Sequence, residues 1–169
     1  MGVAADAHGM RAVTDSVNGR VQILSPVGSL LSSWGSPAPG PTILPRPVAV
    51  VFDAEGNAFV LDQRRARIVA FSRATGQPAG TIAPQGRGPG RLMDPTALAI
   101  DAAGVLYVAD AGNDRIARFR RDGTYLGAIT GTGAGRGIAV TPDGSRIYLS
   151  DTKHRITVYG PDGKELLWF

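Results

Sequence analysis

An aspartate and an arginine recur together four times along the chain, and side chains of these types can do chemistry. Carboxylates serve as general bases and metal ligands, and guanidinium groups bind anions. A residue that returns once in every repeat is expected to serve the repeat, with the aspartate bonding backbone N–H groups and the arginine pairing with it. We therefore predict a structural role for Asp15, Arg20, Asp62, Arg67, Asp110, Arg115, Asp151 and Arg155.

Other familiar chemistry has little support. The chain lacks cysteine, which excludes disulfides, thiolate zinc sites and thiol catalysis. Its two histidines, His8 and His154, fall in loops expected on opposite faces, so we predict no shared metal. The glycine-rich stretch Gly131 to Gly137 has the wrong spacing for a phosphate loop and leads into a predicted strand. We predict no catalytic residue, no metal and no cofactor.

Four aligned segments must position these side chains. They begin near Gly2, Val48, Thr96 and Arg136, and each keeps a turn glycine, an aspartate, an arginine and a second glycine in step. Each segment is predicted to form four short strands joined by tight turns. In the third segment these strands cover 97–100, 106–109, 116–119 and 125–129.

Short strands in units of about 40–50 residues are typical of propeller blades. We predict an all-β protein: a β-propeller of four-stranded antiparallel blades, with four blades in this chain. A single domain over 1–169 is expected, with blades at about 1–35, 46–83, 95–131 and 136–169. No segment keeps a 3.6-residue apolar period, so almost no helix is expected.

The pattern resembles the NHL-repeat family of β-propellers. Asp110, Asn113, Arg115 and Ile116 match its D-x-x-N-x-R-I signature, and residues 86–95 are similar to its inter-blade loop. The stretch from Pro142 to Asp151 is also similar to lactonase-type propeller repeats. The resemblance implies a six-bladed propeller, whereas this chain holds four segments. A partial propeller, a four-bladed ring and a homo-oligomer that completes the propeller are the alternatives.

Charge is expected to divide between the two faces of the propeller. Lysine and arginine number 18 against 14 acidic residues, for a net charge of +4. With the repeat pairs set aside, the loops of one face, called the top, are net basic, and the turns of the other face are net acidic. Because binding sites usually lie on loops of a rigid scaffold, we predict ligand binding by Arg64, Arg65, Arg87, Arg91, Arg136, Lys153 and His154.

Three functions compete. The first is a non-catalytic binding scaffold that engages a protein or an acidic small ligand through the basic top face. The second, implied by similarity to amidating-lyase and lactonase-like propellers, is a metal-dependent enzyme, but the innermost predicted strands are apolar and offer no converging histidines. The third is RNA binding, disfavoured because the long loops 35–46 and 83–96 contain no aromatic residue for base stacking.

Composition says little about location. No run of 18 apolar residues exists, so we expect no transmembrane helix and no membrane partner. The first residues lack a basic segment followed by an apolar one, so no signal peptide is expected. A soluble protein is therefore predicted, extracytoplasmic if it is part of a longer secreted one. Abundant Ala, Gly, Arg and Pro with few Lys favour a bacterial source.

Overall fold

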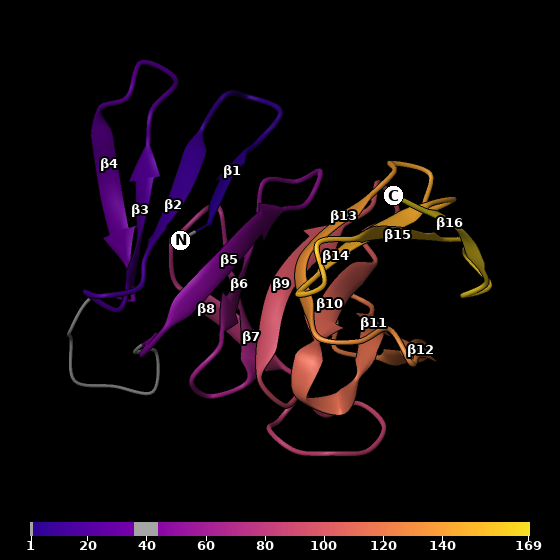
Figure 1. The fold of residues 1–169 in the computed structure, drawn as a ribbon. Coiled ribbons are helices and arrows are strands. Elements are labelled where there is room, and N and C mark those ends of the chain that lie inside the picture. Colours follow the sequence, from indigo (N-terminus) through magenta and orange to yellow (C-terminus); the bar gives the residue numbers. More distant parts are fainter. Residues whose placement is uncertain (1, 36–43) are drawn as a thin grey trace. The chain divides into compact units, whose positions relative to one another are not determined.

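The computed structural model describes residues 2–35 and 44–169 (Figure 1). They form sixteen strands and one short 3-10 turn, η1 (Ala111–Asn113). The strands make four sheets, each with four antiparallel strands in sequence order, which we call blades 1 to 4. The predicted loop 35–46 falls largely on residues 36–43, which lie outside the described part.

Internal contacts divide the chain into two compact units, Met1–Ile82 and Ala83–Phe169. Unit 1 contains blade 1, with β1 (Val3–Ala5), β2 (Arg11–Asp15), β3 (Arg20–Leu24) and β4 (Leu30–Trp34). It also contains blade 2, with β5 (Pro47–Phe52), β6 (Ala58–Asp62), β7 (Arg67–Phe71) and β8 (Pro78–Ile82).

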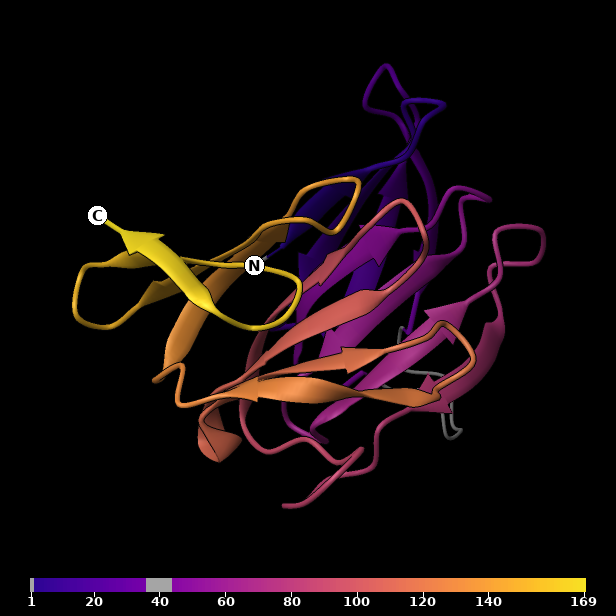
Figure 2. The same ribbon diagram turned by 90° about the vertical axis from the view of Figure 1, so that its right-hand side faces the viewer.

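Unit 2 holds the other two blades, which Figure 2 shows from the side. Blade 3 comprises β9 (Pro95–Ile100), β10 (Leu106–Asp110), β11 (Arg115–Phe119) and β12 (Tyr125–Thr130). Blade 4 comprises β13 (Gly135–Val140), β14 (Ile147–Asp151), β15 (Ile156–Tyr159) and β16 (Glu165–Trp168). The predicted strands of blade 3 are thus found, each extended by no more than two residues.

Local sequence explains the hairpins. In the turn between β9 and β10, Gly104 has φ +82°, a conformation that glycine adopts without steric cost. Asp101 closes this turn, because its side chain accepts a hydrogen bond from the Val105 N–H at 2.9 Å. Its carbonyl accepts another from the Gly104 N–H at 3.0 Å. The D-x-x-G spacing therefore fixes the register between the two strands.

Each unit has a core between its two blades. In unit 1, Trp34 of blade 1 stacks on Phe71 of blade 2, with ring centroids 5.3 Å apart. In unit 2, Ile116 and Ile129 of blade 3 pack with Ile147 and Leu149 of blade 4. The second strand of blades 2 and 3 is buried at all five positions. Full burial of one valine, leucine or phenylalanine side chain in such a strand stabilises the fold by roughly 1.5–3 kcal/mol.

Side-chain hydrogen bonds also join blades 3 and 4. The Thr96 hydroxyl donates to the Gly135 carbonyl at 2.6 Å. Arg118 Nη1 of β11 donates to the carbonyl of Pro161, in the turn between β15 and β16, at 2.9 Å. Unit 2 is therefore a packed pair of blades, and the site described below lies at one end of their junction.

Candidate functional site

The repeat aspartate of blade 3 lies at the centre of a hydrogen-bonded cluster. Asp110 ends β10 and is completely buried. Its carboxylate accepts hydrogen bonds from Arg115 Nε at 2.8 Å, from Asn113 Nδ2 at 2.7 Å and from the Met93 N–H at 2.7 Å. These three donors satisfy the hydrogen-bonding capacity that the Asp110 carboxylate would otherwise lose on burial.

Asn113 and Arg115 also bind the loop that precedes blade 3. Asn113 Nδ2 reaches the Gly86 carbonyl at 3.2 Å, and Arg115 Nη2 reaches the Gly88 carbonyl at 2.9 Å. The same Arg115 nitrogen donates to the carbonyl of Arg91. Asp110, Asn113 and Arg115 therefore fasten residues 86–93 to the blade, and we call these three residues the blade 3 clasp.

Blades 1 and 2 contain the same ion pair. Arg20 Nε lies 2.9 Å from Asp15, and Arg67 Nε lies 3.4 Å from Asp62. Hydrogen bonds from Asn18 and then from Arg20 hold the pKa of Asp15 below its ordinary value. In each of blades 1 to 3 the two residues are directly opposed across the second and third strands.

Blade 4 departs from this arrangement. Its loop between Asp151 and Arg155 is one residue shorter, and the Arg155 side chain is 44% exposed, compared with 10% for Arg115. Asp151 accepts bonds from the backbone N–H groups of Lys153 at 2.7 Å and Arg155 at 3.1 Å. Burial alone would raise the pKa of Asp151, but these bonds and the Arg155 side chain outweigh it and keep the pKa below its ordinary value.

The residue before the repeat arginine has positive φ in all four blades. It is Gly19 at +62°, Ala66 at +46°, Asp114 at +53° and His154 at +62°. A left-handed residue turns the chain sharply, so the arginine that follows can start its strand opposite the aspartate. This conformation explains a glycine in blade 1, and the other three residues adopt it at some cost in strain.

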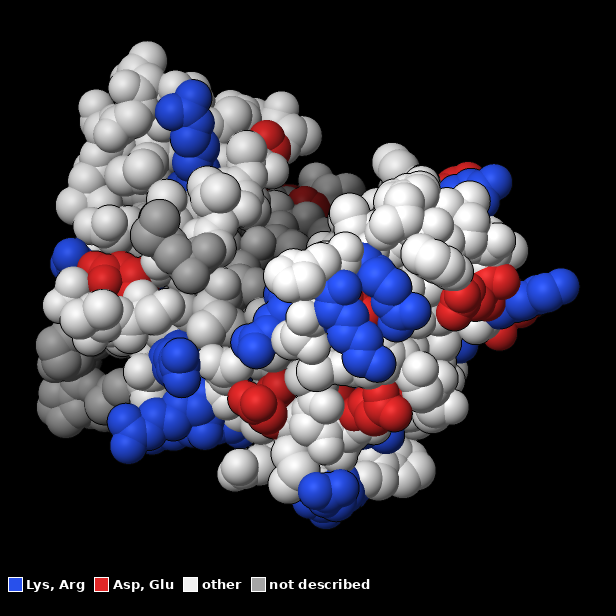
Figure 3. Space-filling view, viewed as in Figure 1, with Lys and Arg blue, Asp and Glu red and all other residues white. Residues whose placement is uncertain are grey.

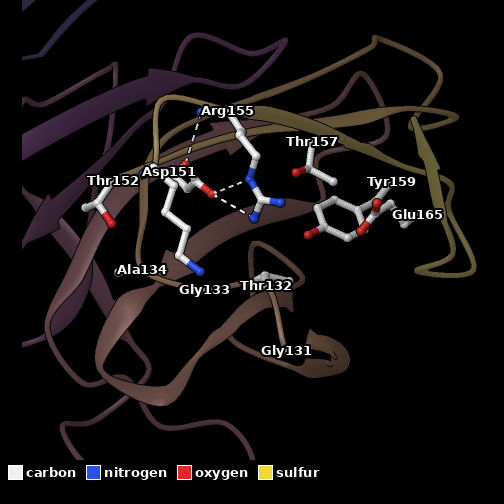
Figure 4. Close-up of a pocket in the computed structure, with 11 residues that line it drawn as sticks. Gly131, Thr132, Gly133, Ala134, Asp151, Thr152, Arg155, Thr157, Tyr159 and Glu165 are labelled. Atoms are coloured by element: carbon white, nitrogen blue, oxygen red, sulfur yellow. Dashed lines mark hydrogen bonds and ion pairs between the residues drawn. The ribbon is translucent and has the colours of Figure 1, made fainter. Parts of the chain in front are cut away.

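A pocket opens beside Arg155, at the end of the junction between blades 3 and 4 (Figure 4). Its volume is about 150 Å³. The Gly131–Ala134 loop forms one wall, and Arg155, Thr157 and Tyr159 line another. Figure 4 shows the Arg155 guanidinium and the Tyr159 ring pointing into the space beside this loop. The remaining lining residues are Asp151, Thr152, Lys153 and Glu165.

The seven residues predicted to bind a ligand divide between the units. Arg64 and Arg65 lie exposed in the turn between β6 and β7 of unit 1. The other five are in unit 2 and are all exposed: Arg87 and Arg91 in the loop before blade 3, Arg136 in β13, and Lys153 and His154 in the turn before β15. Figure 3 shows basic side chains gathered over the part of unit 2 near β13 and β14. Only Lys153 of these residues lines the pocket.

In residues 2–35 and 44–169, no group of three or more His, Asp or Glu side chains is arranged to hold a metal ion. Within the same ranges, no helix is long and apolar enough to cross a membrane.

Comparison with known proteins identifies the fold. The sequence matches no family model and no curated protein. Among solved structures, a streptogramin B lyase superposes with a TM-score of 0.75 at 15% identity, covering 98% of this chain and 52% of that one. Virginiamycin B lyase from Staphylococcus aureus gives 0.75 at 12% identity, with coverages of 98% and 53%. A chain of the nidogen/laminin complex gives 0.82 at 21%, covering 99% and 62%.

These neighbours are propeller proteins, and with the four antiparallel sheets they show that this chain has a β-propeller fold, as its sequence predicts. The chain spans about half the length of the two lyases, 52% and 53%. The expectation of a six-bladed propeller is not met, because the described residues contain four blades. The neighbours include lyases and a component of a protein complex, so the fold is compatible with catalysis and with binding.

Sequence reasoning missed the pocket residues Thr132, Thr157, Tyr159 and Glu165. No motif marks the last three, and Thr132 falls in the glycine-rich stretch whose spacing does not fit a phosphate loop. The one available signal was loop length, because β12 and β13 are joined by residues 131–134, whereas residues 83–94 join β8 and β9. Because the connection is short, it leaves this end of the junction between blades 3 and 4 uncovered. The residues that line the pocket are therefore accessible.

Proposed function

We propose that this chain is an NHL-like propeller that acts as a non-catalytic binding module, and that unit 2 recognises an acidic protein through the loop before blade 3. The observation that carries the proposal is the presentation of Arg87 and Arg91. Both side chains are exposed, while the backbone around them is held by the blade 3 clasp.

Fixing the loop before binding lowers the entropy cost of association. Exposed arginines on such a loop attract carboxylates and bind them in bidentate fashion. Arg136 and Lys153 add positive charge in the same unit. A partner protein is further supported by the nidogen/laminin complex among the structural neighbours, at a TM-score of 0.82.

The test measures binding of a fluorescent poly-L-glutamate peptide to the full chain by anisotropy. The variant R87E/R91E is expected to lose most of the affinity, chiefly through slower association. R120E/R121E is the matched control, because it changes the net charge by the same amount and both arginines are exposed in the turn between β11 and β12. Affinity of the unmodified chain should fall as salt is raised, since exposed charges are screened beyond about 8 Å at physiological ionic strength.

Equal losses in the two variants would overturn the proposal, because charge would then act without regard to position. Binding of a single-stranded RNA oligonucleotide in preference to the peptide would replace it with the RNA alternative. Stoichiometric metal in the purified chain would overturn the non-catalytic part in favour of the lyase-like alternative.

A further inference from the structure

We propose that the pocket beside Arg155 binds a small amino acid zwitterion, with the carboxylate of the ligand toward Thr132, Lys153 and Arg155 and its ammonium toward Glu165. This site differs from the arginine loop and takes a different ligand, so the inference stands or falls independently of the proposed function.

Thr132 supplies the first argument. The residue is only 7% exposed, it lines the pocket, and its hydroxyl has no hydrogen-bond partner in the described structure. Buried hydroxyl groups are nearly always paired, so an unpaired one at a pocket wall indicates a partner that occupies the pocket. A ligand oxygen would satisfy it.

Arg155 supplies the second argument for a ligand in this pocket. In blade 3, Arg115 bonds its aspartate and two carbonyls of the preceding loop. In blade 4, all side-chain hydrogen bonds of Arg155 among the described residues go to Asp151. The Gly131–Ala134 loop is too short to bring carbonyls over the guanidinium. Donors that Arg115 uses on backbone carbonyls in blade 3 therefore face the pocket in blade 4 (Figure 4).

The charges at the two ends of the pocket supply the third argument. Lys153 lies in the turn that leads to Arg155. Glu165 is the cross-strand partner of Tyr159, which lies four residues after Arg155 in the chain. Figure 4 shows Glu165 beside Tyr159 and away from Thr152. Both Lys153 and Glu165 line the pocket, and within the described ranges neither forms an ion pair. The pocket therefore has a basic end and an acidic end.

This polarity selects the ligand. Arg155 offsets the charge of Asp151, and Lys153 and Glu165 carry equal and opposite charges, so the pocket as a whole is neutral. A phosphate dianion would meet repulsion from Glu165, and a plain carboxylate would leave that residue unpaired. A zwitterion matches both ends, and a volume of about 150 Å³ limits it to a small one.

The experiment is a titration of the isotope-labelled full chain, followed by the amide NMR signals of residues 131–134. The probes are L-alanine, propionate, ethylammonium and inorganic phosphate. Saturable shifts are expected with L-alanine, and at least tenfold weaker binding with the other three, because each lacks one of the matched charges or carries an opposed one.

Variants locate the ligand within the pocket. Thr132→Val keeps the shape but loses the hydroxyl, and should weaken L-alanine binding roughly tenfold, whereas Thr132→Ser should retain it. Glu165→Gln should remove the preference for L-alanine over propionate. R87E/R91E should bind L-alanine normally even where it no longer binds poly-L-glutamate.

Two results would overturn the inference. One is the absence of saturable shifts with all four probes, which would mean that water fills the pocket. The other is binding of propionate or phosphate as tightly as L-alanine, which would show that the acidic end plays no part.

Discussion

Blades 3 and 4 contain the same aspartate and arginine, yet the two arginines meet different surroundings. The Arg115 side chain is 10% exposed and donates to backbone carbonyls of a long preceding loop, whereas the Arg155 side chain is 44% exposed and borders a pocket. Two sequence differences separate them: the loop before blade 4 is shorter, and so is the loop between its aspartate and its arginine. A repeat can therefore expose a binding group by shortening the loop that elsewhere covers it.

Each pair also stacks its arginine on an aromatic ring at the same distance. Arg115 lies 6.0 Å from the ring centroid of Tyr125, and Arg155 lies 6.0 Å from that of Trp168. The two rings differ in register, because Tyr125 is opposite Phe119 of β11 and Trp168 is opposite Thr157 of β15. The two arginines therefore reach different positions of the outer strand, and the groups on their other sides differ as well.

The strongest test of this comparison is the removal of each arginine. Arg115→Ala should lower the free energy of unfolding by about 3 kcal/mol, because it leaves the buried carboxylate of Asp110 without its ion-pair partner. Arg155→Ala should cause far less loss, since water can replace an exposed arginine. Urea unfolding followed by circular dichroism measures both. Equal losses would show that burial does not distinguish the two pairs.

Tyr107 belongs to the core between blades 3 and 4 and is the next residue to test. Burial, and then its hydrogen bond to Asp101 at 3.0 Å, raise the pKa of Tyr107 from 10.0 to about 12. A raised pKa stabilises the folded state fully below pH 10 and loses this effect as the pH rises to 12. We expect a loss of about 2 kcal/mol over that range.

The measurement is urea unfolding at pH 9 to 12. Tyr107→Phe, which removes the titrating group, should show a correspondingly smaller decline with pH. A parallel decline in both proteins would mean that other groups control alkaline unfolding.

Asn113 tests whether the clasp fixes the loop. Asn113→Ala should cost about 1 kcal/mol, because it removes hydrogen bonds to Asp110 and to the Gly86 carbonyl. The amides of Gly86 and Leu92 should exchange hydrogen faster. Asn18→Ala is the matched control in blade 1, where the described bonds of the asparagine go only to Asp15. Unchanged exchange at Gly86 would show that Asn113 does not restrain the loop.

The smallest effect is expected at Thr132. In the absence of ligand, Thr132→Val should raise the stability of the chain by less than about 1 kcal/mol, because it replaces an unpaired buried hydroxyl with a methyl group. Thermal unfolding of the two proteins measures the change. A less stable valine variant would indicate that the hydroxyl already has a partner.

The strands could be predicted because each depends on residues close in sequence. Gly104 and Gly123 mark turns and both have positive φ, and the apolar positions between them form the buried strands β10 and β11. The environments of like residues in different blades could not be predicted in this way. Trp34 and Trp168 both lie in the fourth strand of a blade, but Trp34 is buried against Phe71 and Trp168 is 60% exposed.

The candidate site was less predictable because it depends on contacts between a blade and the loop before it. The sequence shows that Asp110 and Arg115 recur, but not that Arg115 reaches the Gly88 carbonyl. The glycine spacing from Gly131 to Gly137 does not fit a phosphate loop. The pocket at Gly131–Ala134 arises instead from side chains of blade 4, which no linear motif records.

The blade 3 clasp also bears on how such a protein can change over evolutionary time. Asn113 and Arg115 bind the loop through its carbonyl groups, and every residue has a carbonyl regardless of its side chain. Exposed positions such as Arg87 can therefore mutate without loss of the anchoring bonds. Selection can alter the ligand preference of the loop by single substitutions, while the blade beneath it keeps its sequence and its stability.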